Sequence, residues 1–164
     1  MNETITIRQA VPADLDACLE IELACFPASE AASRENIAIR IRDFPKGFYV
    51  AECRGSILGQ VNSGATAKDD ISDEAFKALV GHDPAGQNIV VFSLAVLSEQ
   101  RGNGLGAQLM RHFISEARSQ GRRQVLLLCK DALVPFYARL GFMDRGPSAC
   151  THGGAQWREM GLIL

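Results

Sequence analysis

A chain of 164 residues with a net charge of −2 offers no basic surface of the kind that binds nucleic acid. Hydrophobic residues make up 47% and charged residues 22%, as in globular proteins, and the length suits a single domain over residues 1–164. No apolar stretch could span a bilayer and the N-terminus has no basic, apolar leader, so we expect a cytoplasmic protein with no membrane partner.

The cysteines form no Cys-x-x-Cys pair, and their odd number does not fit a disulfide framework. Unpaired thiols are typical of cytosolic proteins, where the environment is reducing. The sequence therefore predicts neither disulfides nor a metal site. The thiols belong to Cys18, Cys25, Cys53, Cys129 and Cys150.

The N-terminal part of the chain predicts one strand and two helices. Residues 5–8 alternate in polarity, as a strand does. Pro12 suits the first turn of a helix, which Pro27 ends. Ser33 suits the N-cap of a second helix, which is closed by Pro45. The apolar stripe of this second helix consists of Ile37, Ile41 and Phe44.

A hairpin and a short helix are predicted next. Residues 48–53 and 57–63 have strand character, and the Arg-Gly pair between them suits a tight turn. After a polar stretch, a short helix is expected over residues 73–80, with Gly81 as its stop.

The stretch from Ser93 to Met110 organises the rest of the chain. The apolar run 89–97 predicts a buried strand, and three glycines alternate shortly after it. A helical pattern follows at once and stops at Gly121. The three glycines are Gly102, Gly104 and Gly106, and the apolar stripe of the helix consists of Leu105, Leu109, Phe113 and Ala117.

The last third of the chain predicts a strand over residues 124–129 and a helix over 133–140. Closing strands are expected over 142–145 and 157–164, separated by a glycine-rich loop that holds His152. The order of these elements predicts an α/β (α+β) fold in which a mixed sheet carries helices on its faces.

Glycines at the start of a helix favour a phosphate ligand, because the free N–H groups and the positive helix end can close on an anion. Gly102-x-Gly104-x-x-Ala107 fits the dinucleotide fingerprint. That fingerprint normally joins the first strand and first helix of its domain, whereas most of this chain precedes it. The alternative pattern is Arg101-x-x-Gly104-x-Gly106.

This second pattern resembles motif A of the GNAT superfamily of acetyltransferases, and the likeness in element order covers nearly the whole chain. The resemblance implies a mostly antiparallel sheet of six to seven strands with a splayed central pair. It also implies acetyl-CoA as cosubstrate, held by the glycine loop and the splayed strand. The residues so assigned to the cofactor are Leu94, Ala95, Val96, Arg101, Gly102, Asn103, Gly104, Leu105, Gly106, Ala107, Tyr137 and Arg139.

Residues 129–142 closely resemble the matching segment of the arylalkylamine (serotonin) N-acetyltransferases, as does Leu94-Ala95-Val96. The resemblance assigns Tyr137 the role of general acid, since a phenol holds its proton at neutral pH and can give it to a departing thiolate. Core packing is the alternative role for this side chain. A backbone N–H near Ala95 or Val96 would polarise the acetyl carbonyl.

The proton acceptor is not supplied by this resemblance. The arylalkylamine enzymes carry a His-x-His in the strand before motif A, and Val90 and Phe92 stand at those positions here. Glu30 and His152 are the replacement candidates, because their loops are expected to flank the acceptor site. Solvated loop positions are the alternative for both.

An amine arrives as a cation, so acidic side chains and an apolar lining are expected around it. Phe26 and Phe92, together with Glu30 and His152, are the expected substrate-binding residues, and core packing is the alternative for the aromatics. Cys129 is read as a buried apolar thiol rather than an acetylated nucleophile. Further candidates for the acidic entrance are Glu22, Asp69 and Asp70, and further candidates for the apolar lining are Phe44 and Phe48.

Together these features predict an N-acetyltransferase that moves an acetyl group from acetyl-CoA directly to a small primary amine. Arylalkylamines, polyamines and amino acids all remain open as acceptors. An acetyl-CoA-binding regulatory or sensor module without efficient turnover is the alternative, because the His-x-His is missing. The sequence leaves the oligomeric state open, a homodimer included.

Overall fold

The computed structural model describes residues 4–164, which form one seven-stranded sheet and four α-helices. The strands are β1 (Thr6–Gln9), β2 (Tyr49–Cys53), β3 (Ser56–Thr66), β4 (Asn88–Val96), β5 (Gln124–Cys129), β6 (Met143–Pro147) and β7 (Arg158–Ile163). The helices are α1 (Leu15–Cys25), α2 (Arg34–Asp43), α3 (Leu105–Ser119) and α4 (Val134–Arg139).

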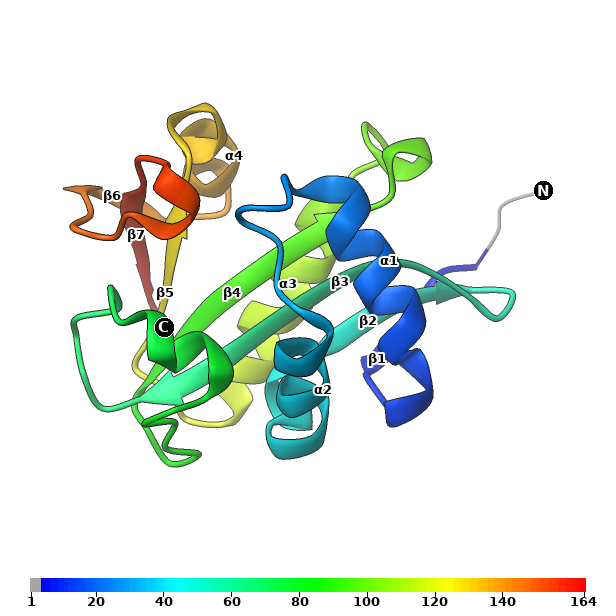
Figure 1. The fold of residues 1–164 in the computed structure, drawn as a ribbon, viewed down its shortest axis with the longest axis horizontal. Coiled ribbons are helices and arrows are strands. Elements are labelled where there is room, and N and C mark those ends of the chain that lie inside the picture. The colour runs from blue at the N-terminus through cyan, green and yellow to red at the C-terminus, as the bar shows by residue number, and fades with distance from the viewer. Residues whose placement is uncertain (1–3) are drawn as a thin grey trace.

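The strand order is β1-β2-β3-β4-β5-β7-β6, and β4–β5 is the parallel pair in an otherwise antiparallel sheet. Helices α1 and α2 cover one face of the sheet and α3 covers the other (Figure 1). The expected mixed, mostly antiparallel sheet with helices on both faces is confirmed.

The central strands are buried on both faces, and alternate side chains enter different cores. In β2, Val50 packs beneath α1 and α2, whereas its neighbours Tyr49 and Ala51 pack in the core on the α3 side. This alternation follows from the two-residue period of a strand.

Helix α3 anchors the larger core. Its predicted stripe of Leu105, Leu109, Phe113 and Ala117 is at most 2% exposed at every position. Gly121 follows the helix with a φ of +76°, a backbone conformation in which glycine meets no Cβ clash.

The predicted signals at helix ends are confirmed for α2 and shifted for α1. Ser33 caps α2 by accepting the Asn36 N–H at 3.1 Å, a contact that typically contributes about 1 kcal/mol. Pro12 begins a single 3₁₀ turn, η1 (Pro12–Asp14), and α1 proper starts at Leu15.

The helix expected over residues 73–80 is a shorter 3₁₀ turn, η3 (Glu74–Ala78). Asp73 caps this turn from outside by accepting the Ala75 N–H at 3.0 Å. Leu79 then takes a φ of +62°, so the turn ends before Gly81 is reached. Leu79 packs against the core on the α3 side, and this burial outweighs the local helical pattern.

Membrane-spanning helices and clusters of metal-ligating side chains are both absent from residues 4–164. No helix there is long and apolar enough to cross a membrane. No group of three or more His, Cys, Asp or Glu side chains there could hold a metal ion. The five cysteines, all within the same residues, are free thiols.

Candidate active site

The sheet opens where β4 and β5 part. The strands pair from Asn88 with Gln124 to Val91 with Leu127, and the pairing goes no further although β4 continues to Val96. Figure 1 shows the strands separating toward the end at which α4 lies. The end of β4 is therefore left without a strand neighbour on one side.

Backbone N–H groups of β4 point into this opening. The Leu97 N–H donates to the Leu58 carbonyl of β3 at 2.9 Å, so Leu97 faces β3. Successive residues of an antiparallel strand direct their N–H groups to opposite sides. Ala95 consequently faces β3 as well, whereas Leu94 and Val96 face the opening. Of the donors expected from the sequence, Val96 is thus the one directed toward a ligand.

The loop between β4 and α3 requires glycine for its backbone rather than for space. Gly102 and Gly104 have φ values of +85° and +78°, and a Cβ at either position would meet no atom within 4 Å. Gly104 is the N-cap of α3 and its carbonyl accepts the Gln108 N–H at 3.0 Å. The N–H groups of the first helical turn before Gln108 have no acceptor within the helix.

A cavity of about 450 Å³, here called the loop cavity, lies against this loop. Arg101, Arg111 and Arg139 line it, and no acidic residue is among its described lining residues. Free helix N–H groups and guanidinium groups both bind phosphate, so the site fits the pyrophosphate of a coenzyme A ligand. The predicted cofactor residues that line it are Val96, Arg101, Gly102, Gly104, Leu105, Gly106, Ala107 and Arg139.

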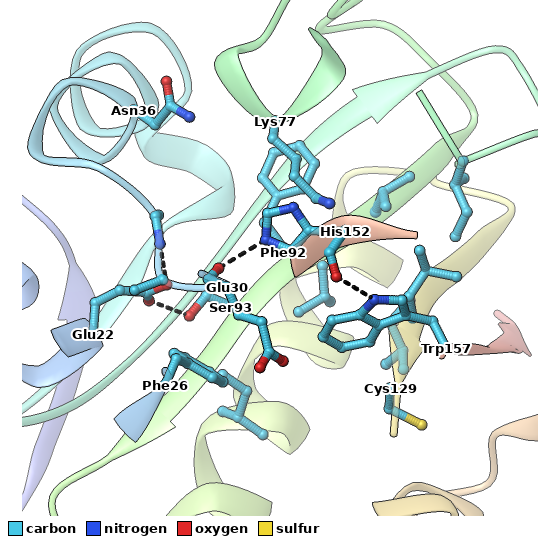
Figure 2. Close-up of a pocket in the computed structure, with 18 of the residues that line it drawn as sticks. Glu22, Phe26, Glu30, Asn36, Lys77, Phe92, Ser93, Cys129, His152 and Trp157 are labelled. Carbon is cyan, nitrogen blue, oxygen red and sulfur yellow. Dashed lines mark hydrogen bonds between the residues drawn. The ribbon is translucent and has the colours of Figure 1, made fainter. Parts of the chain in front are cut away.

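A second cavity of about 450 Å³, here called the aromatic cavity, is built from the α1–α2 connection, η3, β4, β5 and the turn η6 (His152–Gly154) (Figure 2). Leu94 and Tyr137 line this cavity, while their neighbours Val96 and Phe136 line the loop cavity. Neighbouring residues of β4, and likewise of α4, therefore line different cavities. The aromatic side chains that give the name are Phe26, Phe76, Phe92, Tyr137 and Trp157.

The aromatic cavity brings together all the residues expected from the sequence to act in catalysis or substrate binding. They are Phe26, Glu30, Phe92, Tyr137 and His152. Two expected cofactor residues, Ala95 and Asn103, line neither cavity. The aromatics Phe44 and Phe48 are buried in the cores, and the acids Asp69 and Asp70 are not part of the cavity lining.

Tyr137 presents a buried phenol to the aromatic cavity. Its ring lies edge-on to Phe136 and Phe142, with centroids 4.9 and 5.6 Å away. Burial raises the pKa of Tyr137 above its ordinary value, so the hydroxyl stays protonated at neutral pH. The hydroxyl has no hydrogen-bond partner within residues 4–164, which leaves its proton available to a ligand.

His152 is held at both ring nitrogens. Nδ1 lies 3.0 Å from the Glu74 carboxylate and Nε2 lies 2.8 Å from the Glu30 backbone carbonyl. Both neighbours are acceptors, so each ring nitrogen that carries a proton can donate to one of them. Through these contacts His152 joins η3, η6 and the α1–α2 connection.

Glu30 is ion-paired across the edge of the same cavity. Its Oε1 lies 2.7 Å from Lys130 Nζ, and its side chain is only 6% exposed. Lys130 also lies over the Trp157 ring, 5.8 Å from its centroid. The Glu30–Lys130 pair therefore links the α1–α2 connection to the end of β5 at the edge of the cavity.

Glu22 is the buried acid of the cavity, and no cation pairs with it in the described part of the chain. Its Oε1 accepts the Ser93 hydroxyl at 2.6 Å, and its Oε2 accepts the Ala32 N–H at 2.8 Å. Figure 2 shows the carboxylate directed at Ser93, which lies at the open end of β4. This hydroxyl–carboxylate pair can carry a proton away from the cavity.

The cavity residues that were not singled out in the sequence include Arg40, Ser93 and Trp157. Ser93 and Trp157 give no pattern that separates them from ordinary strand residues. Arg40 does give one, because it lies between Ile37 and Phe44 on the apolar stripe of α2 and is buried with them. A charged residue on the buried face of a helix is the recognisable signal.

Cys129 ends β5 at the aromatic cavity and is 3% exposed. Burial raises the pKa of its thiol to about 11, so little thiolate is present at neutral pH. This environment suits the apolar packing role expected from the sequence.

Comparison with known proteins places this geometry in a family. Residues 15–142 match the model of the acetyltransferase (GNAT) family. The serotonin N-acetyltransferase of Macaca mulatta is 36% identical over 122 residues, which cover 74% of this chain and 54% of the relative. The chain thus spans about half the length of the curated relatives that it matches first.

Solved structures share the fold at low sequence identity. The loading GNATL domain of CurA from Lyngbya majuscula superimposes with a TM-score of 0.86 at 16% identity, covering 98% of both chains. The GphF GNAT-like decarboxylase, solved in complex with isobutyryl-CoA, gives a TM-score of 0.80 at 21% identity and covers 96% of this chain and 98% of its own.

Proposed function

The chain belongs to the GNAT family of acetyltransferases, and on that premise we propose that it is an acetyl-CoA-dependent N-acetyltransferase acting on a small primary amine. The observation that carries the proposal is the placement of the two cavities. An arginine-rich cavity at a helix N-terminus and an aromatic cavity flank the same open end of β4. An acyl donor in the first and an acceptor in the second would meet at Leu94–Val96 and Tyr137.

The related proteins support both an amine acceptor and an acyl-CoA donor as substrates. Serotonin N-acetyltransferase, as its name says, acetylates an amine, and the GphF structure contains an acyl-CoA. The aromatic lining and the buried carboxylate of Glu22 suit an amine with an apolar body.

Each residue has a defined task in direct transfer. Acetyl-CoA, when bound, supplies an activated acetyl thioester. The N–H groups at the start of α3, with Arg101 and Arg139, hold the pyrophosphate. The Val96 N–H polarises the acetyl carbonyl, as an oxyanion hole does.

Protons then move in two directions. Ser93 receives a proton from the amine and passes its own to Glu22 Oε1, along a hydrogen bond of 2.6 Å. Tyr137 gives its proton to the sulfur that leaves. The proton that Ser93 receives is the one an ammonium group loses before it attacks. The nitrogen loses its second proton as the amide forms, and this proton restores Tyr137. Glu22 gives its proton to solvent, so one proton is released per turnover of an ammonium substrate.

Thermal unfolding with acetyl-CoA, CoA or NADH at equal concentrations tests the donor. A ligand at a hundredfold excess over its Kd stabilises the folded state by about 2.7 kcal/mol. We expect stabilisation by acetyl-CoA and CoA and none by NADH. Stabilisation by NADH alone would restore the dinucleotide interpretation of the glycine loop.

Release of free CoA thiol with a panel of primary amines tests the reaction. Turnover with at least one amine, and the acetylated product in mass spectra, is the expected result. Stabilisation by acetyl-CoA without turnover on any amine would favour the alternative of a regulatory or sensor module. That alternative rests on the absence of the His-x-His, since Val90 and Phe92 stand at its positions.

A further inference from the structure

Arg40 is a buried cation on the wall of the aromatic cavity. The residue is 2% exposed, lies in the last turn of α2, and lines the cavity together with Phe92. Its guanidinium carbon is 4.5 Å from the centroid of the Phe92 ring, so the cation rests on an aromatic face. Burial lowers the pKa of Arg40 to about 10, and the side chain stays charged at neutral pH.

The guanidinium has no carboxylate partner. Nε donates to the Lys77 carbonyl at 3.1 Å and Nη1 donates to Asn62 Oδ1 at 3.1 Å. Within residues 4–164, Nη2 has no hydrogen-bond acceptor, and the Arg40 guanidinium has no carboxylate within 4.0 Å. Glu22 acts on Arg40 only through the longer-range electrostatic field.

The other cations of the cavity differ in this respect. Lys77 lies 2.9 Å from Glu74 and Lys130 lies 2.7 Å from Glu30, so each has its own counterion. A buried charge normally pairs, because leaving an ion unpaired in a low dielectric is costly. Arg40 therefore lacks the anion that its neighbours have.

A second donor next to Arg40 is also unused. Asn62 Nδ2 is buried and has no hydrogen-bond partner among the described residues. The amide oxygen of the same side chain is committed to Arg40 Nη1. The adjacent side chains of Arg40 and Asn62 thus each have N–H groups without an acceptor, and neither side chain carries a carboxylate.

Building on the proposed function, we propose that Arg40 is the counterion for a carboxylate on the molecule bound in the aromatic cavity. The acceptor is then an amino carboxylate, such as an amino acid, rather than an uncharged arylalkylamine. A planar guanidinium pairs well with a carboxylate, and Phe92 beneath it fixes its orientation. The same chemistry could be delivered by the acyl group if the donor were a dicarboxylic acyl-CoA, and the experiment separates the two sources.

Matched acceptor pairs test the proposal directly. Phenylalanine and phenethylamine, and likewise tryptophan and tryptamine, differ only in the carboxylate. We expect kcat/KM to favour the carboxylate member by about ten- to hundredfold, the range of a charge-assisted hydrogen bond. Equal or lower kcat/KM for the amino acids, together with no gain from a carboxylate on the acyl group, overturns the proposal.

The variant Asn62→Asp gives Arg40 an internal counterion with almost no change in shape. The new carboxylate takes the place of an amide 3.1 Å from Nη1, so the fold is expected to be kept and thermal unfolding checks it. The preference for the carboxylate member should disappear. Arg42→Gln is the matched control, because Arg42 is exposed on the same helix and pairs with Asp43. This control should keep the preference.

A binding measurement keeps the proposal testable if no amine is acetylated. Calorimetry would compare N-acetylphenylalanine with N-acetylphenethylamine, on the wild-type chain and on Asn62→Asp. Tighter binding of the carboxylate ligand to the wild type alone supports the role of Arg40 even if the proposed transfer fails. Equal binding of both ligands to the wild type, together with no gain from malonyl-CoA in the donor assay, overturns it even if transfer succeeds.

A comparison of two acyl-CoA donors identifies whether the carboxylate belongs to the acceptor or to the acyl group. Phenethylamine would be assayed with acetyl-CoA and with malonyl-CoA. A faster reaction with malonyl-CoA that Asn62→Asp removes assigns the carboxylate to the acyl group. A reaction that prefers acetyl-CoA, combined with the preference for amino acids, assigns it to the acceptor.

Discussion

The two cavities have similar volumes but are assembled in different ways. The loop cavity is built mainly from one continuous segment, residues 100–107, with α4 closing one side. The aromatic cavity takes its walls from five separate parts of the chain. A site made by consecutive residues can be recognised as a motif, whereas a site made by distant segments exists only after folding.

The cavities also differ in electrostatics. The loop cavity is uniformly basic, as a phosphate ligand requires. The aromatic cavity contains acids and bases that largely neutralise each other, and Glu22 and Arg40 are its buried charged side chains without an ion pair among the described residues. Under the proposed function, the loop cavity would bind the donor, and the aromatic cavity would carry the chemistry and select the acceptor.

Tyr137→Phe should break the chemistry while leaving the loop cavity intact. Loss of a general acid typically costs about 10²- to 10⁴-fold in kcat, whereas the Kd for acetyl-CoA should change little. Because burial raises the pKa of Tyr137, kcat should show no fall due to this group below about pH 10. Steady-state kinetics and calorimetry check both points.

Tyr49→Phe is the matched control for this variant. The Tyr49 hydroxyl donates to the Lys46 carbonyl at 2.6 Å and belongs to neither cavity, so kcat should be kept. If Tyr137→Phe retains full turnover, Tyr137 is a core aromatic and another group protonates the thiolate.

Ser93→Ala should interrupt the path from the amine to Glu22. We expect kcat/KM to fall by about tenfold or more, and the loss to shrink at high pH, where the free amine needs no proton acceptor. Initial rates from pH 6 to about pH 10 would show this convergence. A loss that is constant over that range would mean that Ser93 only positions the substrate.

Glu22→Gln tests the other end of the same path. The carboxylate accepts from Ser93 and Ala32, and an amide cannot accept with both of its atoms, so some stability is lost as well. Glu20→Gln, on the exposed side of the same helix, is the control and should match the wild type in rate and Tm. A Glu22→Gln enzyme with normal rates would place the base elsewhere.

Gly104→Ala should weaken acetyl-CoA binding in the loop cavity and leave the aromatic cavity unchanged. A Cβ at φ of +78° costs about 1–2 kcal/mol, and relaxation of the loop should weaken acetyl-CoA binding by about tenfold. Gly106→Ala is the contrast, since Gly106 is helical and its Cβ would lie 3.6 Å from Phe136, an ordinary contact. Denaturant unfolding should separate the two variants, and equal stabilities would contradict the strain account.

Cys129→Ala should have the smallest effect. With its pKa raised to about 11 the thiol is protonated at neutral pH, so direct transfer predicts a kcat close to that of the wild type. Mass spectrometry after mixing with acetyl-CoA should find no acetylated enzyme. An acetyl adduct that disappears in the variant would instead indicate a covalent intermediate at Cys129.

The comparison also explains which predictions succeeded. The cap at Ser33, the stripe of α3 and the strand β5 were predicted because each depends on residues a few positions apart. The helix expected over residues 73–80 was wrong in type and length, because the partly buried Leu79 packs against the core with a left-handed backbone that ends the turn. Tertiary packing overrides local propensity at such positions.

The roles of the acidic and basic residues in the aromatic cavity could not be predicted from short-range patterns in the sequence. His152 is engaged by Glu74 and Glu30, which are 78 and 122 positions away in the chain. Glu22 meets Ser93 across 71 positions, and Glu30 meets Lys130 across 100. No pattern in the sequence indicates which acids will be paired and which will be left alone.

The sequence by itself determined the order of strands and helices, the glycine loop before α3 and the family likeness at Tyr137. These features follow from short-range periodicity, from glycine's access to positive φ and from consecutive residues. Only the tertiary structure decided that Glu22 faces Ser93, that His152 is fully engaged and that Arg40 is buried without a counterion. Those facts depend on desolvation and on contacts between distant segments, which are fixed when the sheet and its helices pack together.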